Sequence, residues 1–202
     1  VVLFLFTLLE PYDRFIGSLT SSPVPRGILF FLGVSWAESL LMIPFGLYAN
    51  FRIEARHGFN RMSAGLWWGD LAKGLLVSSV LLAVAGGGAF WLIAAAPGTW
   101  WLWVWLLFIG LSVLLMYLSP ILIEPLFFKL QPLESGGLEH DVRALAERAG
   151  VRVSRVFTVD ASRRSGHSNA YFTGIGRTKR VVLFDTLLSQ LTPAQILGVL
   201  AH

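Results

Sequence analysis

Residues 100–123 read WWLWVWLLFIGLSVLLMYLSPILI, and no side chain in this stretch carries a charge. About 20 apolar residues in a helix are enough to cross the hydrocarbon core of a bilayer. Four tryptophans, at positions 100, 101, 103 and 105, open the stretch, and such a cluster is typical of the interface between membrane and water. The stretch therefore predicts a transmembrane helix.

Two more stretches are long and apolar enough to span a membrane, residues 27–49 and residues 71–95. Residues 1–9 are also apolar but too short to cross, so we interpret them as the end of a span that begins earlier. At the other end the sequence stops at His202, within a helical pattern. We therefore expect the chain to be a fragment that is cut at both ends.

Composition divides the chain into two parts. Hydrophobic residues make up 55% of it and charged residues only 14%, whereas an ordinary soluble domain has about 25% charged residues. All eight tryptophans lie between Trp36 and Trp105, and residues 134–202 contain none. We expect a transmembrane region over residues 1–133 and a polar part outside the bilayer over residues 134–202.

The excess of basic over acidic residues has two explanations, binding to nucleic acid or the cytoplasmic face of a membrane. In such an apolar chain the second is favoured, so we expect the lipid bilayer as a partner and no nucleic acid. The absence of cysteine excludes disulfides, thiolate nucleophiles and cysteine-type zinc sites.

Lysine and arginine in the short connectors predict the orientation of the spans. The connector over residues 52–73 holds four basic side chains, whereas the turn at residues 97–99 holds no charge. The positive-inside rule therefore places this connector in the cytoplasm. Two further crossings bring the polar part back to the cytoplasmic side. Residues 10–26, taken as a loop, then face outward.

Two helices are predicted in the polar part. Apolar residues recur with helical period over residues 138–149, and Gly150 is placed to end this helix. A second helix is predicted after Thr192, because Pro193 suits the first helical position and Gln195 completes a capping box.

Three strands are predicted beside these helices. The first covers residues 155–159, and residues 169–173 and 180–184 form a hairpin through a turn-like segment at residues 174–178. The polar part is therefore expected to be α+β.

His202 is the one residue whose local pattern points to a metal. The preceding run, GVLA, has the composition that opens an H-E-x-x-H helix, in which two histidines one turn apart bind one zinc ion and the glutamate activates water. A single histidine after an apolar run is more often a structural or capping residue. Both interpretations stay open from the residues alone.

Four stretches carry a resemblance to a known family. They are residues 53–60 (IEARHGFN), 123–133 (IEPLFFKLQPL), 163–174 (RRSGHSNAYFTG) and 179–188 (KRVVLFDTLL). Together they resemble the integral-membrane CAAX prenyl protease type 1 family. The members of this family are zinc metallopeptidases of the gluzincin group. The expected fold is a mainly α polytopic membrane protein, with a transmembrane helical bundle followed by a small, incomplete α+β metalloprotease portion in the cytoplasm.

The resemblance implies roles for particular residues. His202 is expected to be the first ligand of one Zn²⁺ per complete chain, and the general base is expected directly after it, so no catalytic residue is expected within the chain. Asn169, Ala170 and Tyr171 are expected to line the active-site cleft, where their strand pairs with an extended peptide substrate. The alternative is that these three residues form one more hairpin strand.

Two ionisable residues remain open. His167 could be a ligand or a base by residue type, but the family takes its ligands elsewhere, so we interpret it as a loop residue near the site. Glu38 is an acidic residue inside a span, which makes it a functional candidate. It could face the water-filled chamber that the family encloses, or form a hydrogen bond between helices.

The function expected from the resemblance is that of a membrane zinc metalloendopeptidase that hydrolyses peptide bonds in C-terminal CAAX or membrane-associated substrates. Two alternatives are a polytopic transporter or channel that uses the span with Glu38, and a catalytically dead membrane scaffold. The chain alone is expected to be inactive. Its residue usage favours a bacterial inner membrane over the endoplasmic reticulum.

Overall fold

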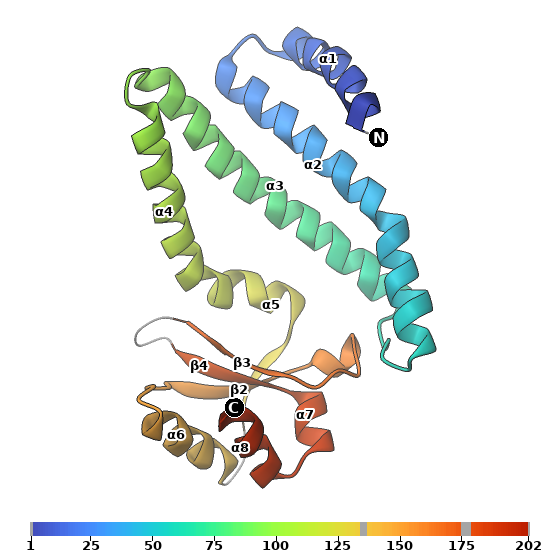
Figure 1. Ribbon diagram of the computed structural model, residues 1–202, viewed down its shortest axis with the longest axis vertical. Coiled ribbons are helices and arrows are strands. Elements are labelled where there is room, and N and C mark those ends of the chain that lie inside the picture. Colours follow the sequence, from blue (N-terminus) through green and yellow to red (C-terminus); the bar gives the residue numbers. More distant parts are fainter. Residues whose placement is uncertain (1, 134–136, 175–178, 202) are drawn as a thin grey trace. The chain divides into compact units, whose positions relative to one another are not determined.

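Close contacts divide the chain into two units in the computed structural model. The helical unit comprises residues 1–45 and 71–113, and the sheet unit comprises residues 46–70 and 114–202 (Figure 1). The structure describes residues 2–133, 137–174 and 179–201.

Long helices supply the helical unit: α1 (Val2–Leu19), α2 (Pro23–Tyr48), α3 (Ala64–Ala95) and α4 (Trp100–Leu118). Apolar side chains surround α2, α3 and α4 on all sides, and no residue of these three helices is buried within the protein. A helix of this kind forms its backbone hydrogen bonds internally and can leave its side chains to lipid. The chain is therefore an integral membrane protein with several spans.

Within the described residues, three stretches are long and apolar enough to cross a membrane: Pro23–Glu54, Ala64–Ala95 and Trp100–Phe127. They confirm the three expected spans but have wider bounds. The second span begins seven residues earlier than the predicted residue 71 because Trp67 and Trp68 continue its apolar surface, and the acidic residue that follows them is accommodated in the helix.

π-Helical turns extend the other two spans. The turn η1 (Ala49–Glu54) follows α2, and the turn η2 (Ser119–Ile123) follows α4 and leads into α5 (Glu124–Phe127). A π-helical turn holds more residues than an α-helical one and therefore changes the direction in which the next side chains point. Both turns are followed by segments of the sheet unit.

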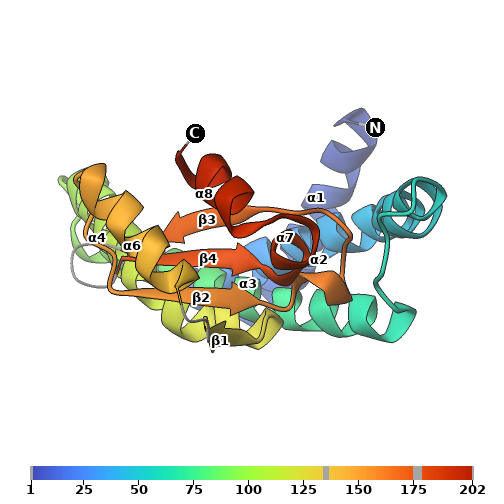
Figure 2. The same ribbon diagram turned by 90° about the horizontal axis from the view of Figure 1, so that it is seen from below.

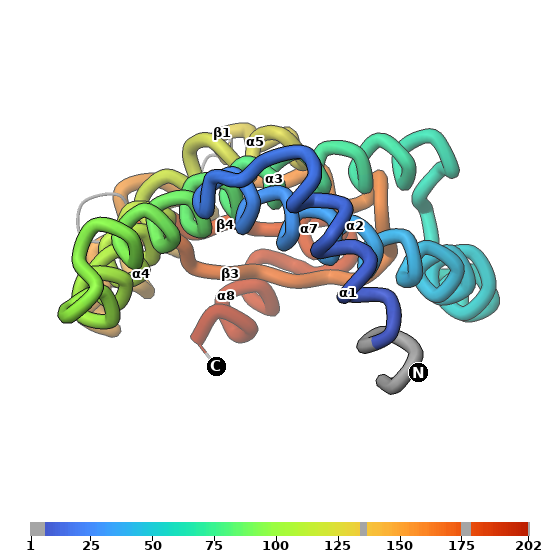
Figure 3. The backbone as a smooth tube through the Cα atoms, turned by 90° about the horizontal axis from the view of Figure 1, so that it is seen from above, coloured from blue at the N-terminus to red at the C-terminus, as the bar shows by residue number. Residues whose placement is uncertain are grey.

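The segment over residues 10–26 was expected to be a loop, and this was wrong. Helix α1 continues to Leu19, and α2 begins at Pro23. The polar side chains of this segment form ion pairs that are compatible with helix, between Arg14 and Glu10 one turn apart and between Arg26 and Asp13 of the neighbouring helix. Helices α1 and α2 lie side by side next to the turn that joins them (Figure 3).

A four-stranded sheet with the order β1-β2-β4-β3 forms the centre of the sheet unit. Its strands are β1 (Leu130–Pro132), β2 (Arg155–Val159), β3 (Ala170–Thr173) and β4 (Arg180–Phe184). β2 and β4 are parallel, whereas β1 and β3 each pair antiparallel with their single neighbour. β3 is therefore an edge strand.

Three helices cover one face of this sheet: α6 (Leu138–Arg148), α7 (Asp185–Gln190) and α8 (Pro193–Ala201) (Figure 2). The core on this face consists of buried apolar side chains: Leu133, Val142, Val156, Val181, Leu183, Leu187 and Ile196. On the opposite face Val159, Ala161 and Val182 are buried. The residues that pack against them are Phe128, Leu130, Phe157, Tyr171 and Phe184. β4 contributes to both cores because its side chains alternate between the two faces.

The predicted elements of the polar part are confirmed. Strands β2 and β4 have the predicted bounds, and helix α6 ends before Gly150, whose φ of 74° is the left-handed conformation that glycine adopts most easily. The N–H of Thr192 donates to Oε1 of Gln195 at 2.9 Å, which is the return half of the predicted capping box. Four of the five residues of the predicted hairpin turn, 175–178, lie outside the described residues.

Several short elements were not predicted, among them β1, α7 and the 3-10 helix η3 (Ala161–Arg163). β1 has three residues and ends in Pro132, and α7 has six residues, so neither shows a periodic pattern that a sequence could reveal. β1 pairs with β2, although it precedes the expected domain boundary between residues 133 and 134, which stays a prediction.

Candidate substrate strand and metal site

The backbone of β3 presents one free edge. The N–H of Phe184 donates to the carbonyl of Asn169 at 3.0 Å, so the backbone groups of Asn169 face β4. In an antiparallel pair these groups alternate, and Tyr171 and Thr173 therefore also face β4. The backbone groups of Ala170 and Phe172 face away from the sheet.

One of these outward groups is already used. The N–H of Ala170 donates to Oδ1 of Asn169 at 2.8 Å. The carbonyl groups of Ala170 and Phe172 accept no hydrogen bond from the described residues, and the N–H of Phe172 donates none to them. This part of the edge can therefore pair with an additional extended chain.

The side chains of β3 lie on opposite faces of the sheet. Ala170 packs against the core beneath the helices, whereas Tyr171 packs against Phe184 on the other face, with ring centroids 6.2 Å apart and planes at 89°. The hydroxyl of Tyr171 donates to the carboxylate of Glu124. Because its backbone faces β4 and its side chain is engaged by Glu124, Tyr171 makes no direct contact at the free edge.

Glu124 also pairs with Arg180 of β4. Both side chains are only 14% exposed, and Nη2 of Arg180 donates in addition to the carbonyl of Pro120 at 2.5 Å. The guanidinium lies over the ring of Phe157, 5.3 Å from its centroid. The end of the third span is thus joined to the middle of the sheet by a largely buried polar cluster.

Tyr171 remains a proton donor in this cluster. Burial raises the pKa of Tyr171 above its ordinary value, the hydrogen bond to Glu124 and the negative charge of Glu124 raise it further, and the charge of Arg180 acts weakly in the opposite direction. The phenol therefore stays protonated well above neutral pH.

The segment before β3 is held by a second ion pair. Nε of Arg164 lies 2.8 Å from Oδ2 of Asp70, and its Nη2 lies 3.1 Å from Oδ1, which is a bidentate arrangement. The two side chains are 12% and 16% exposed. Arg164 also donates to the carbonyl of Phe127 and lies over the ring of Phe128, 4.5 Å from its centroid.

His167 contacts the connector between the first two spans. Its Nε2 lies 3.1 Å from Oε2 of Glu54, and its ring stacks on Phe59 with centroids 4.1 Å apart. The N–H of Gly166 donates to the carbonyl of Phe59 at 2.7 Å. The structure thus shows His167 beside the acidic side chain of Glu54, as a residue of the loop before β3.

The described residues contain no group of three histidine, cysteine, aspartate or glutamate side chains that could hold a metal ion. His202 lies outside the described residues, whose last helix, α8, ends at Ala201. The residues that the structure describes therefore do not form a metal site.

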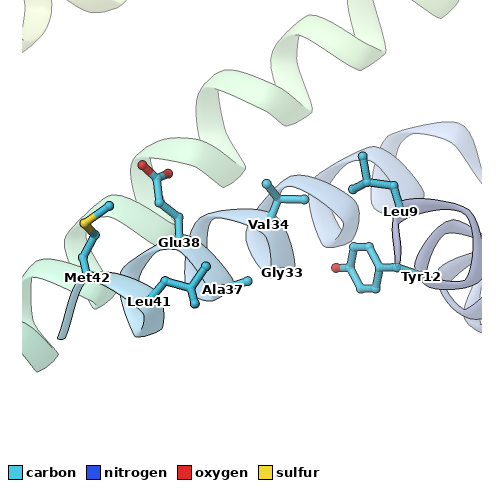
Figure 4. A pocket seen from close by; sticks show the side chains of 8 residues that line it. All are labelled: Leu9, Tyr12, Gly33, Val34, Ala37, Glu38, Leu41 and Met42. Carbon is cyan, nitrogen blue, oxygen red and sulfur yellow. The ribbon is translucent and has the colours of Figure 1, made fainter. Parts of the chain in front are cut away.

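Glu38 belongs to the helical unit and lies in an apolar groove of about 500 Å³ between α1 and α2. Its side chain projects from α2 in line with Val34 and Met42, one turn to either side (Figure 4). Among the described residues, no side chain or backbone group of another helix forms a hydrogen bond with Glu38. This favours a groove-lining position over the alternative of a bond between helices. The groove is lined by Leu9, Tyr12, Gly33, Val34, Ala37, Glu38, Leu41 and Met42.

Two protein families match almost the whole length of the chain. The family described as the CAAX prenyl protease N-terminal region with five membrane helices matches residues 1–129, and peptidase family M48 matches residues 132–202. The two matches meet close to the position where the chain enters the sheet.

Individual relatives agree with this. CAAX prenyl protease 1 of Saccharomyces cerevisiae is 40% identical over 187 residues, which cover 90% of this chain and 40% of the relative. The probable CAAX prenyl protease 1 of Schizosaccharomyces pombe is 34% identical over 182 residues, which cover 90% of the chain and 38% of the relative. The human CAAX prenyl protease 1 homolog is 32% identical over 180 residues, which cover 88% of this chain and 38% of the relative.

A solved structure is similar as well. The crystal structure of Ste24p from S. mikatae matches with a TM-score of 0.90 and 31% sequence identity, over 100% of this chain and 49% of that one. The chain therefore spans about half of that structure and about 40% of the length of the curated relatives it matches.

Proposed function

The chain belongs to the CAAX prenyl protease type 1 family of membrane M48 peptidases, and from this premise we propose that the protein is an integral-membrane zinc endopeptidase. Its substrates are polypeptides with a C-terminal CAAX segment or other membrane-associated chains, the first of which is the class that the names of its relatives state. The comparisons favour this function over a transporter or a channel.

The free edge of β3 is the observation that supports the proposal most. An extended substrate pairs with the carbonyl of Ala170 and with the N–H and carbonyl of Phe172, because these groups face outward and lack partners among the described residues. Asn169 stands at the start of this edge and is exposed, so its amide N–H groups can reach the same peptide. Ala170 contributes its backbone, and Tyr171 acts through the position of the strand.

His202 is proposed as the first zinc ligand, one residue beyond α8. The family pattern places the general base directly after it. Zinc bound in such a site polarises the scissile carbonyl and lowers the pKa of a bound water. The described residues supply no ligand set, so no chemical step is assigned to them. Their part is to bind and align the substrate beside α8.

The sheet unit is proposed to face the cytoplasm, and the basic connector after the first span supports this. Single cysteines test it, because the chain has no native cysteine. In intact cells, a reagent that cannot cross the membrane should label Gly98→Cys and spare Arg56→Cys. The reverse pattern would overturn the orientation. Residue usage favours a bacterial inner membrane for this chain, while the relatives named above are eukaryotic.

Cleavage by the purified full-length protein tests the proposed function. We expect it to hydrolyse a fluorogenic peptide that ends in a farnesylated CAAX segment, to lose activity with a zinc chelator and to regain it when zinc is added back. One zinc per chain without cleavage would indicate a catalytically dead scaffold. A protein with neither zinc nor cleavage would contradict the proposal.

A further inference from the structure

Two acidic residues of the sheet unit stand at π-helical turns. Glu54 is the last residue of η1, and Glu124 directly follows η2. Such turns are rare and are found often at functional sites, since they redirect the side chains that follow them. Here the redirected carboxylates meet the polypeptide segment that leads into and through β3.

The two carboxylates bind different parts of that segment. Glu54 contacts His167, three residues before β3, and Glu124 accepts the hydroxyl of Tyr171 within β3. The first contact is exposed, with side-chain exposures of 39% and 54%, whereas Glu124 is 14% exposed. The contact between Glu124 and Tyr171 is therefore the one that solvent screens least.

We propose that Glu124 and Tyr171 are positioning residues for peptide binding at the edge of β3. The inference rests on the function proposed above and assigns these two residues a task within it. Glu124 holds the phenol of Tyr171 in place, and the fixed side chain in turn holds β3 in its position and twist. The outward backbone groups of Phe172 then lie where a substrate strand can pair with them.

The geometry of β3 makes such a tether necessary. The strand has four residues and only one neighbouring strand, so one ladder of hydrogen bonds holds it. Among the described residues, Tyr171 is also the only residue of this strand whose side chain forms a polar contact with the end of a membrane span. The ring of Tyr171 packs on Phe184 with or without the hydroxyl. The hydroxyl therefore contributes to the position of the strand and not to the burial of the ring.

Tyr171→Phe in the full-length protein tests the proposal, because it removes the hydroxyl and keeps the ring. Loss of one hydrogen bond to a charged acceptor should raise KM for the peptide about tenfold. Since ground-state and transition-state binding weaken together, kcat should change by less than about twofold. Zinc content should be unchanged.

Tyr117→Phe is the matched control. Tyr117 lies in α4, its side chain is 42% exposed, and its hydroxyl has no hydrogen-bond partner among the described residues. This variant should keep the wild-type KM and kcat. Glu124→Gln removes the charge that holds the hydroxyl of Tyr171 and also the counter-charge of Arg180, so KM should rise at least as much as in Tyr171→Phe. The double variant should be no worse in KM than Glu124→Gln alone, because the contact between these two residues can be lost only once.

Amide hydrogen exchange supplies a readout that does not depend on catalysis. In Tyr171→Phe the amides of β3 should exchange about tenfold faster, while those of β2 keep their rate. Unchanged exchange in β3, or an unchanged KM in an active variant, would overturn the positioning role. A loss of zinc and kcat at constant KM would show a structural role instead. A wild-type protein that fails to cleave would refute the proposed function, and the exchange rates would still decide whether Glu124 and Tyr171 position the strand.

Discussion

The helical unit and the sheet unit are stabilised in different ways. In α2, α3 and α4 no residue is buried within the protein, whereas Val181, Val182 and Leu183 of β4 are each 0% exposed. A helix completes its hydrogen bonds with residues four positions away, but a strand needs partners that are distant in sequence. The helices therefore depend on lipid around them, and the sheet depends on its own core.

Two ion pairs of the sheet unit are buried more deeply than the described ion pairs of the helical unit. The pair Arg14–Glu10 of the helical unit has side-chain exposures of 76% and 71%. The pairs Arg164–Asp70 and Arg180–Glu124 of the sheet unit have exposures between 12% and 16%. An exposed pair contributes little to stability, while breaking a buried pair leaves a charge without a partner. Substitutions of the same kind should thus have unequal effects in the two units.

Truncation of a core side chain should give the largest difference. Leu183→Ala removes a side chain that is 0% exposed and should lower the free energy of unfolding by about 2–5 kcal/mol. Leu76→Ala, at a position 67% exposed in α3, should change it by less than about 1 kcal/mol. Chemical unfolding in detergent, followed by circular dichroism, measures both. Equal losses would show that the helical unit has a protein core of its own.

Removal of one acidic partner should have the next largest effect. Asp70→Asn should cost about 3 kcal/mol, because the guanidinium of Arg164 stays largely buried without its counter-charge. Glu10→Gln, in the exposed pair, should cost less than about 1 kcal/mol. The same unfolding assay compares them, and a cost for Glu10→Gln as large as that for Asp70→Asn would break the distinction.

Alkaline pH should have a smaller effect, confined to the sheet unit. The pKa of Tyr171 is raised in the folded protein, so below pH 10, roughly, folded and unfolded chains both keep the proton. At higher pH only the unfolded chain loses it, and stability falls by up to about 1.4 kcal/mol per pH unit. Tyr171→Phe should lack this component. Unfolding curves of the wild-type protein and of Tyr171→Phe between pH 9 and 11, roughly, measure the difference. An equal loss of stability in both proteins would show that Tyr171 is not a buried proton donor.

Elements that depend on local sequence pattern could be predicted from the sequence. The three spans follow from apolar length, and β2, β4, α6 and the start of α8 follow from periodicity and capping residues. Strand β1, with three residues, and helix α7, with six, were not predicted because elements this short show no periodic pattern of apolar residues. Helix α1 continued past residue 9 because its polar residues pair one turn apart or with the next helix.

The candidate site was predictable only in part. The family motif identified Asn169, Ala170 and Tyr171, and the edge position of their strand agrees with a role in pairing, which stays a prediction. Motif and spacing gave no sign that Tyr171 turns toward Glu124, because that contact joins residues 47 positions apart. A lone acidic residue directly after a span was the available signal. The role of His202 stays a prediction as well.

Pairing of the substrate with the free edge of β3 is the central claim, and Phe172→Pro tests it most directly. Proline at this edge position removes an outward N–H without breaking the bonds to β4, and Phe172→Ala is the control that keeps the N–H. In the full-length protein, we expect Phe172→Pro to lower kcat/KM for the CAAX peptide by at least about a hundredfold with zinc content intact, and Phe172→Ala to have a much smaller effect. Normal cleavage by the zinc-loaded Phe172→Pro protein would contradict the account.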